Sequence, residues 1–205
     1  LYIGTAMTGR RGAGVNAIGA IDMALWDIKG KYENKPVYEL MGGNFHETIT
    51  PYASLQPLGS SFEEYRDSLV EWAEKARNLG FRAVKSEVTM NGPYAHNGME
   101  ENDEKHTLVL EAVRKALGPE IKLMVDVQYK WKTAEDALRT VKDWKEFDIY
   151  FLETPVWTDS LDDYARMHEE APMKIAAGEW LSTSYEFYDL ITKGKIDVAQ
   201  PDIGR

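Results

Sequence analysis

The chain has 205 residues, of which 43% are hydrophobic and 28% are charged, and its formal net charge is −10. This composition is that of a globular protein with one or two domains, and the acidic balance without a Lys/Arg run argues against a nucleic-acid partner. No apolar run reaches the length of a membrane span, and the absence of cysteine excludes disulfides and zinc–thiolate sites and fits a reducing compartment such as the cytoplasm.

The first part of the chain has a helical pattern. Gly-rich residues 9–14 predict a loop, and apolar residues at helical spacing between 17 and 28 predict one amphipathic helix. Lys35-Pro36 interrupts this pattern before a short second helix. We therefore expect residues 1–48 to be distinct from residues 49–205.

From about residue 50 onward, apolar strand-like runs alternate with segments of helical period. Capping-box pairs mark two helix starts, Ser61 with Glu64 and Thr183 with Glu186. This alternation predicts a parallel sheet with helices outside it. The strand candidates are 50–55, 81–88, 121–127, 149–154, 174–179 and 196–202.

Three acidic residues stand at near-equal spacing at the ends of successive strand candidates: Asp126, Glu153 and Glu179. In a parallel barrel the C-terminal ends of the strands meet at one rim, where active sites lie. Carboxylates that close repel one another unless a cation joins them, and this number of hard oxygen ligands suits Mg²⁺. Each acid alone could equally cap the helix that follows it. Three in register favour a metal site.

Two further strand ends carry candidate catalytic residues. Side chains alternate along a strand, so Lys85 and Glu87 should point the same way. A lysine aimed at a metal-bound carboxylate could neutralise it or act as a base, whereas the alternative is an interior Lys–Glu pair. Asp202, after the sixth candidate strand, could orient a histidine or cap a helix.

Polar side chains nearby are candidate substrate contacts. Gln128 shares the face of Asp126 and could bind substrate or metal-bound water. The longest polar insertion, residues 89–105, contains His96, which could swing over the site or remain an ordinary surface histidine; loops of this length are usually functional or mobile. His106 falls in a helical pattern and we expect it to be exposed.

These residues lie in segments that resemble the enolase superfamily, in its mandelate racemase and muconate lactonizing enzyme branch. The Glu-Thr-Pro and Gly-Glu motifs at their mutual spacing are quite specific to this family, and the matches follow the family's order over nearly the whole chain. The matching segments are residues 17–31, Val-Asp-Val-Gln at 125–128, Phe-Leu-Glu-Thr-Pro at 151–155 and Ala-Gly-Glu-Trp at 177–180, with Pro201-Asp202 as a weaker fifth.

The resemblance implies a TIM-type (β/α)7β barrel with an α+β capping domain. It implies Mg²⁺ held by Asp126, Glu153 and Glu179, and abstraction of the proton α to a substrate carboxylate through an enediolate. That proton is too weakly acidic for a neutral-pH base unless the developing dianion is neutralised. Asp202 resembles the acid of a His–Asp dyad whose histidine would follow on strand seven.

Two departures from the family pattern concern the site. The strand-two motif, often Lys-x-Lys, reads Lys85-Ser86-Glu87, so the residue that often takes the α-proton is a carboxylate; it could be the base, be a spectator, or mark an inactive face. Gln128 stands where the third-strand motif usually has Asn. Because such a barrel needs about 250 residues, we expect an incomplete barrel of about six βα units with the tail end of the capping domain.

These patterns favour a Mg²⁺-dependent lyase that dehydrates a sugar acid. A racemase or epimerase of the same branch is the nearest alternative, and a non-catalytic metal-binding barrel is another, favoured by Glu87 and opposed by the retained Lys85. We expect a small carboxylate as substrate, a homo-oligomer and a cytoplasmic location, with neither nucleic acid nor membrane as partner.

Overall fold

The computed structural model describes residues 1–204, which divide into two compact units. The first unit comprises Leu1–Ile49, Glu179–Phe187 and the residues from Pro201 onward, and the second comprises Thr50–Gly178 and Tyr188–Gln200.

The first unit is helical and contains α1 (Tyr2–Gly9), α2 (Ala13–Glu33) and α3 (Val37–Leu40). The predicted loop at 9–14 is a tight turn between α1 and α2. A Cβ atom on Gly14 would lie 2.4 Å from the Gly9 Cα, so only glycine allows the two backbones to approach this closely. Helix α2 ends at Asn34, which has a left-handed φ of 51°, and Pro36 then prevents its continuation.

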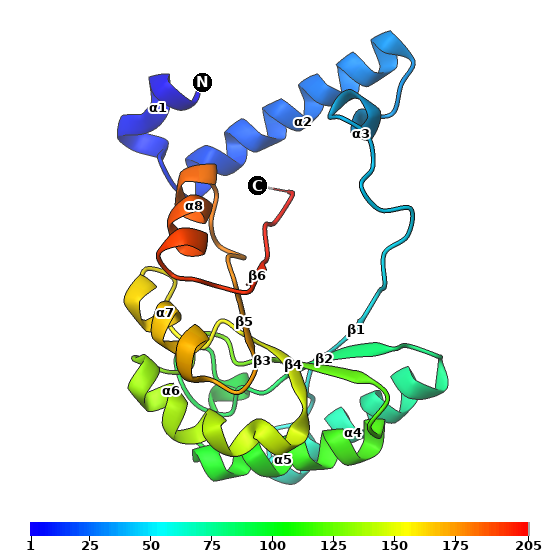
Figure 1. Ribbon diagram of the computed structural model, residues 1–205, viewed down its shortest axis with the longest axis vertical. Coiled ribbons are helices and arrows are strands. Elements are labelled where there is room, and N and C mark those ends of the chain that lie inside the picture. Colours follow the sequence, from blue (N-terminus) through cyan, green and yellow to red (C-terminus); the bar gives the residue numbers. More distant parts are fainter. Residues whose placement is uncertain (205) are drawn as a thin grey trace. The chain divides into compact units, whose positions relative to one another are not determined.

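The second unit is built on a six-stranded sheet (Figure 1). Every strand pair is parallel, and the strand order follows the sequence. This confirms the predicted α/β alternation, although the last strand is shorter than its candidate range. Within residues 1–204 the sheet does not close, since β1 and β6 each pair on one side only. The strands are β1 (Ala53–Leu55), β2 (Ala83–Glu87), β3 (Lys122–Asp126), β4 (Ile149–Glu153), β5 (Lys174–Ala177) and β6 (Val198–Ala199).

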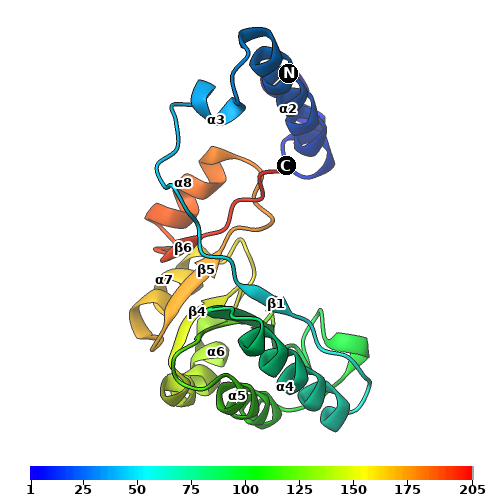
Figure 2. The ribbon, with the colours of Figure 1, turned by 90° about the vertical axis from the view of Figure 1, so that its right-hand side faces the viewer.

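Helices connect the successive strands, and those between β1 and β5 lie along one face of the sheet (Figure 2). The capping box at Ser61 is formed: its side chain accepts from the Glu64 N–H, and the Glu64 side chain accepts from the Ser61 N–H. At the second predicted box one half is formed, since the Thr183 hydroxyl accepts from the Glu186 N–H at 3.3 Å, but the backbone N–H that donates to the Glu186 carboxylate is that of Ser182. The elements are α4 (Phe62–Asn78), α5 (Asp103–Leu117), α6 (Ala134–Val141), α7 (Leu161–Glu170) and α8 (Ser184–Thr192), with 3₁₀ turns η1 (His96–Gly98) and η2 (Lys142–Phe147).

The opposite face of the sheet carries an apolar inner layer. One residue from each of five strands contributes to it: Ala83, Met124, Phe151, Ala176 and Val198. Because side chains alternate along a strand, the residue two positions further on points to the same side. On β2, β3 and β4 these residues are Lys85, Asp126 and Glu153. The fold therefore stacks a polar layer on the apolar one, at the C-terminal ends of the strands.

Candidate active site

The centre of this polar layer is a buried cation shared by two carboxylates. The Lys85 Nζ donates to both Glu153 oxygens, at 2.8 and 3.0 Å, and lies 3.6 Å from Asp126 Oδ2. All three side chains are at most 15% exposed. Burial opposes the ammonium charge, but Glu153 and Asp126 outweigh it, so the pKa of Lys85 is raised. Lys85 is therefore a cation in this arrangement.

The other oxygen of Asp126 is fixed by its surroundings. Oδ1 accepts hydrogen bonds from the Gln128 backbone N–H, at 3.0 Å, and from the Thr154 hydroxyl, at 3.2 Å. Gln128, Tyr129 and Thr154 all have left-handed φ angles, which non-glycine residues seldom adopt. Such backbone strain is concentrated at functional sites. Sequence reasoning missed Thr154, although its place in the Glu-Thr-Pro motif was visible.

Glu87 is half-buried on the same side of β2 as Lys85. Its Oε1 accepts a hydrogen bond of 3.1 Å from the Thr89 hydroxyl. Burial raises the pKa of Glu87, and Thr89, His96 and Lys85 oppose this shift without reversing it. A carboxylate with a raised pKa at a strand end is suited to proton transfer near neutral pH.

The long polar insertion is an ordered loop rather than an open flap. The backbone N–H of Glu101 donates to Met90 O at 2.9 Å, and that of His96 donates to Thr89 O at 2.8 Å. His96 Nε2 lies 3.0 Å from Gly59 O and must donate to it, since a carbonyl oxygen only accepts. The His96 ring also packs edge-on against Tyr65, at 5.5 Å between centroids. His96 is thus held beside the Glu87 strand end.

A second polar cluster holds the base of this loop and was not predicted from the sequence. Lys130, whose side chain is fully buried, donates to Asp103 at 2.7 Å and to the Asn91 side chain. Trp131 and Thr140 donate to the other Asp103 oxygen at 3.0 and 2.6 Å. Burial raises the pKa of Asp103, but these hydrogen bonds outweigh it and hold that pKa well below its usual range. No spacing in the sequence points to this pair.

His106 completes the cluster and corrects an expectation. We predicted it to be exposed because it falls in a helical pattern, but it is fully buried. Its Nε2 accepts from the Met90 N–H and its Nδ1 lies 3.0 Å from Asn102 O, so one ring joins both ends of the loop. Burial, assisted by the nearby Lys130 charge, lowers the pKa of His106 to about 4, and the ring is neutral.

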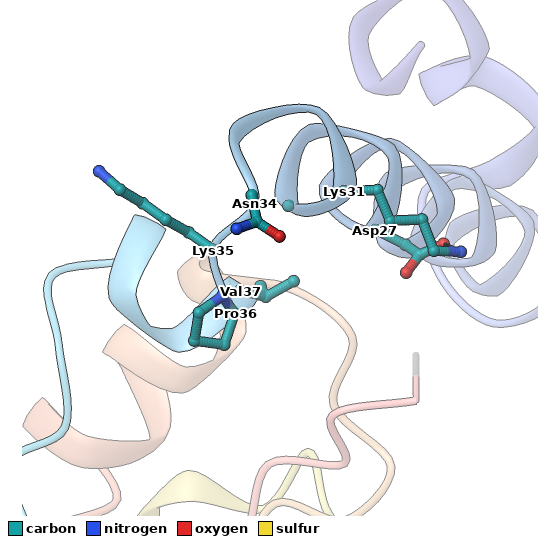
Figure 3. Close-up of a pocket in the computed structure, with 7 residues that line it drawn as sticks. Asp27, Lys31, Asn34, Lys35, Pro36 and Val37 are labelled. Atoms are coloured by element: carbon teal, nitrogen blue, oxygen red, sulfur yellow. Dashed lines mark hydrogen bonds and ion pairs between the residues drawn. The ribbon is translucent and has the colours of Figure 1, made fainter.

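An open pocket of about 430 Å³ lies in the first unit beside the C-terminal end of α2 (Figure 3). Lys31 and Asp27, one turn apart, form an exposed ion pair of 2.6 Å, and Lys35 extends away from the other side chains drawn. None of the residues predicted for the site lines this pocket. Its lining residues are Asp27, Gly30, Lys31, Asn34, Lys35, Pro36 and Val37.

Comparison with known protein families matches most of the chain. Residues 68–205 match the family described as "Enolase C-terminal domain-like", and residues 5–42 match "Mandelate racemase / muconate lactonizing enzyme, N-terminal domain". The chain belongs to the enolase superfamily, in its mandelate racemase and muconate lactonizing enzyme branch. The resemblance inferred from the motifs is confirmed.

Individual members of the superfamily are similar along the whole chain. An arabinonate dehydratase of Saccharolobus solfataricus is 33% identical over 99% of this chain and 51% of its own length. The crystal structure of the 3,6-anhydro-D-galactonate cycloisomerase from Zobellia galactanivorans has a TM-score of 0.83 and 34% identity, covering 99% and 52% of the two chains. A racemase from Streptomyces coelicolor A3(2) with bound magnesium has a TM-score of 0.79 and 32% identity, covering 96% and 54%.

These comparisons establish the fold more fully than the chemistry. The chain spans about half the length of the curated relatives it matches. The structural neighbours are TIM-barrel proteins of the superfamily, and the six-stranded parallel sheet is part of that architecture. No helix within residues 1–204 is both long and apolar enough to cross a membrane.

The structure brings together two of the three carboxylates of the predicted site. Asp126 and Glu153 share Lys85 within the second unit, whereas Glu179 and Asp202 belong to the first unit. Among the described residues, no three His, Asp or Glu side chains are gathered as a ready metal site. The roles of Glu179 and Asp202 stay predictions. Two buried carboxylates held against one ammonium ion are nevertheless a donor set that suits a hard cation such as Mg²⁺.

Proposed function

We propose that the intact protein is an enzyme that removes the proton α to the carboxylate of a sugar acid and then eliminates water. The observation that carries this proposal is the buried Lys85–Glu153–Asp126 cluster at the C-terminal ends of the strands, with Glu87 beside it. The relatives named as a dehydratase and as cycloisomerases support the same general type of reaction and substrate class. The substrate would be a small hydroxylated carboxylate.

The proposed metal ligands are Asp126, Glu153 and Glu179. Bound Mg²⁺ would supply Lewis-acid stabilisation of the negative charge that develops on the substrate carboxylate. The protein's own contribution is to hold the carboxylates in place: Thr154 and the Gln128 N–H orient Asp126, and Lys85 orients Glu153. The superfamily member with bound magnesium supports this choice of ion.

The proposed catalytic groups are Glu87 and Lys85. Because Lys85 is charged while it contacts Glu153 and Asp126, it cannot accept a proton in this arrangement, and we assign it an electrostatic role. Glu87 has its pKa raised by burial and would accept the α-proton on one face of the substrate. His96 and Gln128 would contact the substrate, and Asp202 would orient a histidine of the intact protein.

A racemase or epimerase is the second candidate, and Glu87 is the observation that favours it. Racemisation needs a proton acceptor on one face of the substrate and a donor on the opposite face. A working base at Glu87, combined with a His–Asp dyad oriented by Asp202, would provide both. A dehydratase needs one such base for the first step. The two reactions therefore differ in the number of substrate faces on which the α-proton is exchanged.

The test is a screen of sugar acids with the intact protein in D₂O with Mg²⁺. We expect exchange of the substrate α-hydrogen for deuterium, seen by NMR, together with 2-keto-3-deoxy products. Exchange that racemises the substrate without such products would indicate the second candidate. Absence of both exchange and product across aldonic and aldaric acids, in a protein that binds Mg²⁺, would indicate a non-catalytic metal-binding barrel.

A further inference from the structure

The inner face of the sheet identifies one more residue of the polar layer. A step of two residues along each strand leads from the apolar layer to the polar one, from Ala83 to Lys85 on β2 for example. On β6 the same step leads from Val198 to Gln200. The Gln200 N–H donates to Ala177 O at 3.0 Å, so the ladder, and with it the alternation of side chains, continues to Gln200.

The side chain of Gln200 has an unmet hydrogen-bonding requirement. Its Oε1 is shielded from solvent and finds no hydrogen-bond partner in the part of the chain that the structure describes. A buried carbonyl oxygen left in this state destabilises the folded chain. A Met or Leu side chain of similar size would pack on the apolar layer without that cost. The amide is therefore suited to a ligand rather than to packing.

The neighbouring strand places no side chain between the amide and the carboxylates. Strand β5 lies between β4 and β6 in the sheet. The two-residue step on β5 leads from Ala176 to Gly178, which has no side chain. No β5 side chain therefore stands between Glu153 and Gln200 at this level of the polar layer.

We propose that Gln200 is a substrate-contacting residue whose amide oxygen accepts a hydrogen bond from a hydroxyl group of the hydroxy-acid substrate. This inference rests on the proposed function of the same site. An amide oxygen only accepts, and an ionised substrate carboxylate has no proton to donate. The hydroxyl groups are the donors that distinguish a sugar acid from a simple carboxylate. Gln200 thus favours substrates that carry a hydroxyl group over those that do not.

The test compares two diacids that differ by one hydroxyl group, tartronate and malonate. Their dissociation constants are measured by calorimetry with the intact protein in saturating Mg²⁺, for the wild type and for Gln200→Met, which keeps the length of the side chain. We expect Gln200→Met to weaken tartronate binding roughly three- to tenfold more than malonate binding. Gln200→Glu keeps an acceptor oxygen at this position and should retain the tartronate preference, although the added charge weakens both diacids.

Controls separate this contact from other roles. The Mg²⁺ dissociation constant of Gln200→Met should be close to wild type, and its melting temperature should be equal to that of the wild type or higher, because the variant removes a buried oxygen without a partner. Equal weakening of the two diacids, no weakening, or a loss of Mg²⁺ affinity would overturn the assignment of Gln200 while leaving the proposed function intact. A wild-type protein that binds neither diacid in a Mg²⁺-dependent way and exchanges no α-hydrogen would overturn both.

Discussion

Lys85 on β2 and Glu153 on β4 form a buried ion pair across the strand between them. The Lys85 Nζ lies 2.8 Å from one Glu153 oxygen and 3.0 Å from the other, and it also approaches Asp126 on the intervening β3. Like-charged carboxylates this close need a counter-charge, which the lysine supplies. A metal ion bound to the same carboxylates would compete with it.

Two substitutions should therefore change Mg²⁺ affinity in opposite directions. Glu153→Gln keeps the side-chain shape but removes a negative charge, and we expect it to weaken Mg²⁺ binding and abolish turnover. Lys85→Met removes the competing cation, and we expect it to strengthen Mg²⁺ binding, although turnover is lost. Calorimetric titration of the intact protein with Mg²⁺ measures both. Unchanged affinity and turnover in Glu153→Gln would count decisively against the metal assignment.

Glu87→Gln tests the proposed base without removing a metal ligand. We expect loss of α-hydrogen exchange on one face of the substrate, because an amide cannot accept the proton, while Mg²⁺ affinity stays nearly unchanged. NMR spectra of stereospecifically deuterated substrate identify the face on which the α-hydrogen is exchanged. If exchange survives Glu87→Gln and disappears only when the dyad histidine is replaced, Glu87 is a spectator and the chemistry is one-faced, which favours a dehydratase.

Breaking the buried pair at the base of the loop should be costly. Lys130→Met leaves the partly exposed Asp103 carboxylate without its cation, and we expect a loss of about 2 kcal/mol in the free energy of unfolding, the worth of a hydrogen bond to a charged group. The double variant Lys130→Met with Asp103→Asn should recover part of this loss, because neither group then carries an unpaired charge. Urea denaturation of the four proteins completes the cycle. Additive losses would show that the two side chains are not coupled.

His106 predicts a pH dependence of stability. Its pKa is lowered to about 4 in the folded state, against an ordinary value near 6.5, so the unfolded chain binds the additional proton between these pH values. Stability from the neutral ring is present above pH 6.5 and is lost as the pH falls towards 4, by about 3 kcal/mol in all.

His106→Gln keeps groups that can hydrogen-bond but does not titrate in this range. The wild type should therefore lose more stability than His106→Gln between pH 6.5 and 4, as measured by denaturant unfolding at each pH. Parallel pH profiles for the two proteins would show that His106 is not responsible. Asp103, whose pKa is held well below its usual range, stays ionised between these pH values.

The sequence patterns predicted the fold of the second unit because the features that indicate its strands and helices are local. Strand ends, capping boxes and the βα alternation each depend on neighbouring residues, and the pairing of Lys85 with strand-end carboxylates followed from side-chain alternation. The Lys130–Asp103 pair and the buried His106 were missed because tertiary packing creates them between segments far apart in sequence. Gln200 was missed because only the register of the sheet shows which of its polar strand-end residues face inward.

The most direct test of the central claim is a crystal structure of the intact protein with Mn²⁺ replacing Mg²⁺, located by its anomalous scattering. We expect a single strong peak coordinated by carboxylate oxygens of Asp126, Glu153 and Glu179 at about 2.0–2.2 Å, with octahedral geometry. A peak elsewhere, or one that lacks Glu179 among its ligands, would contradict the proposed metal site.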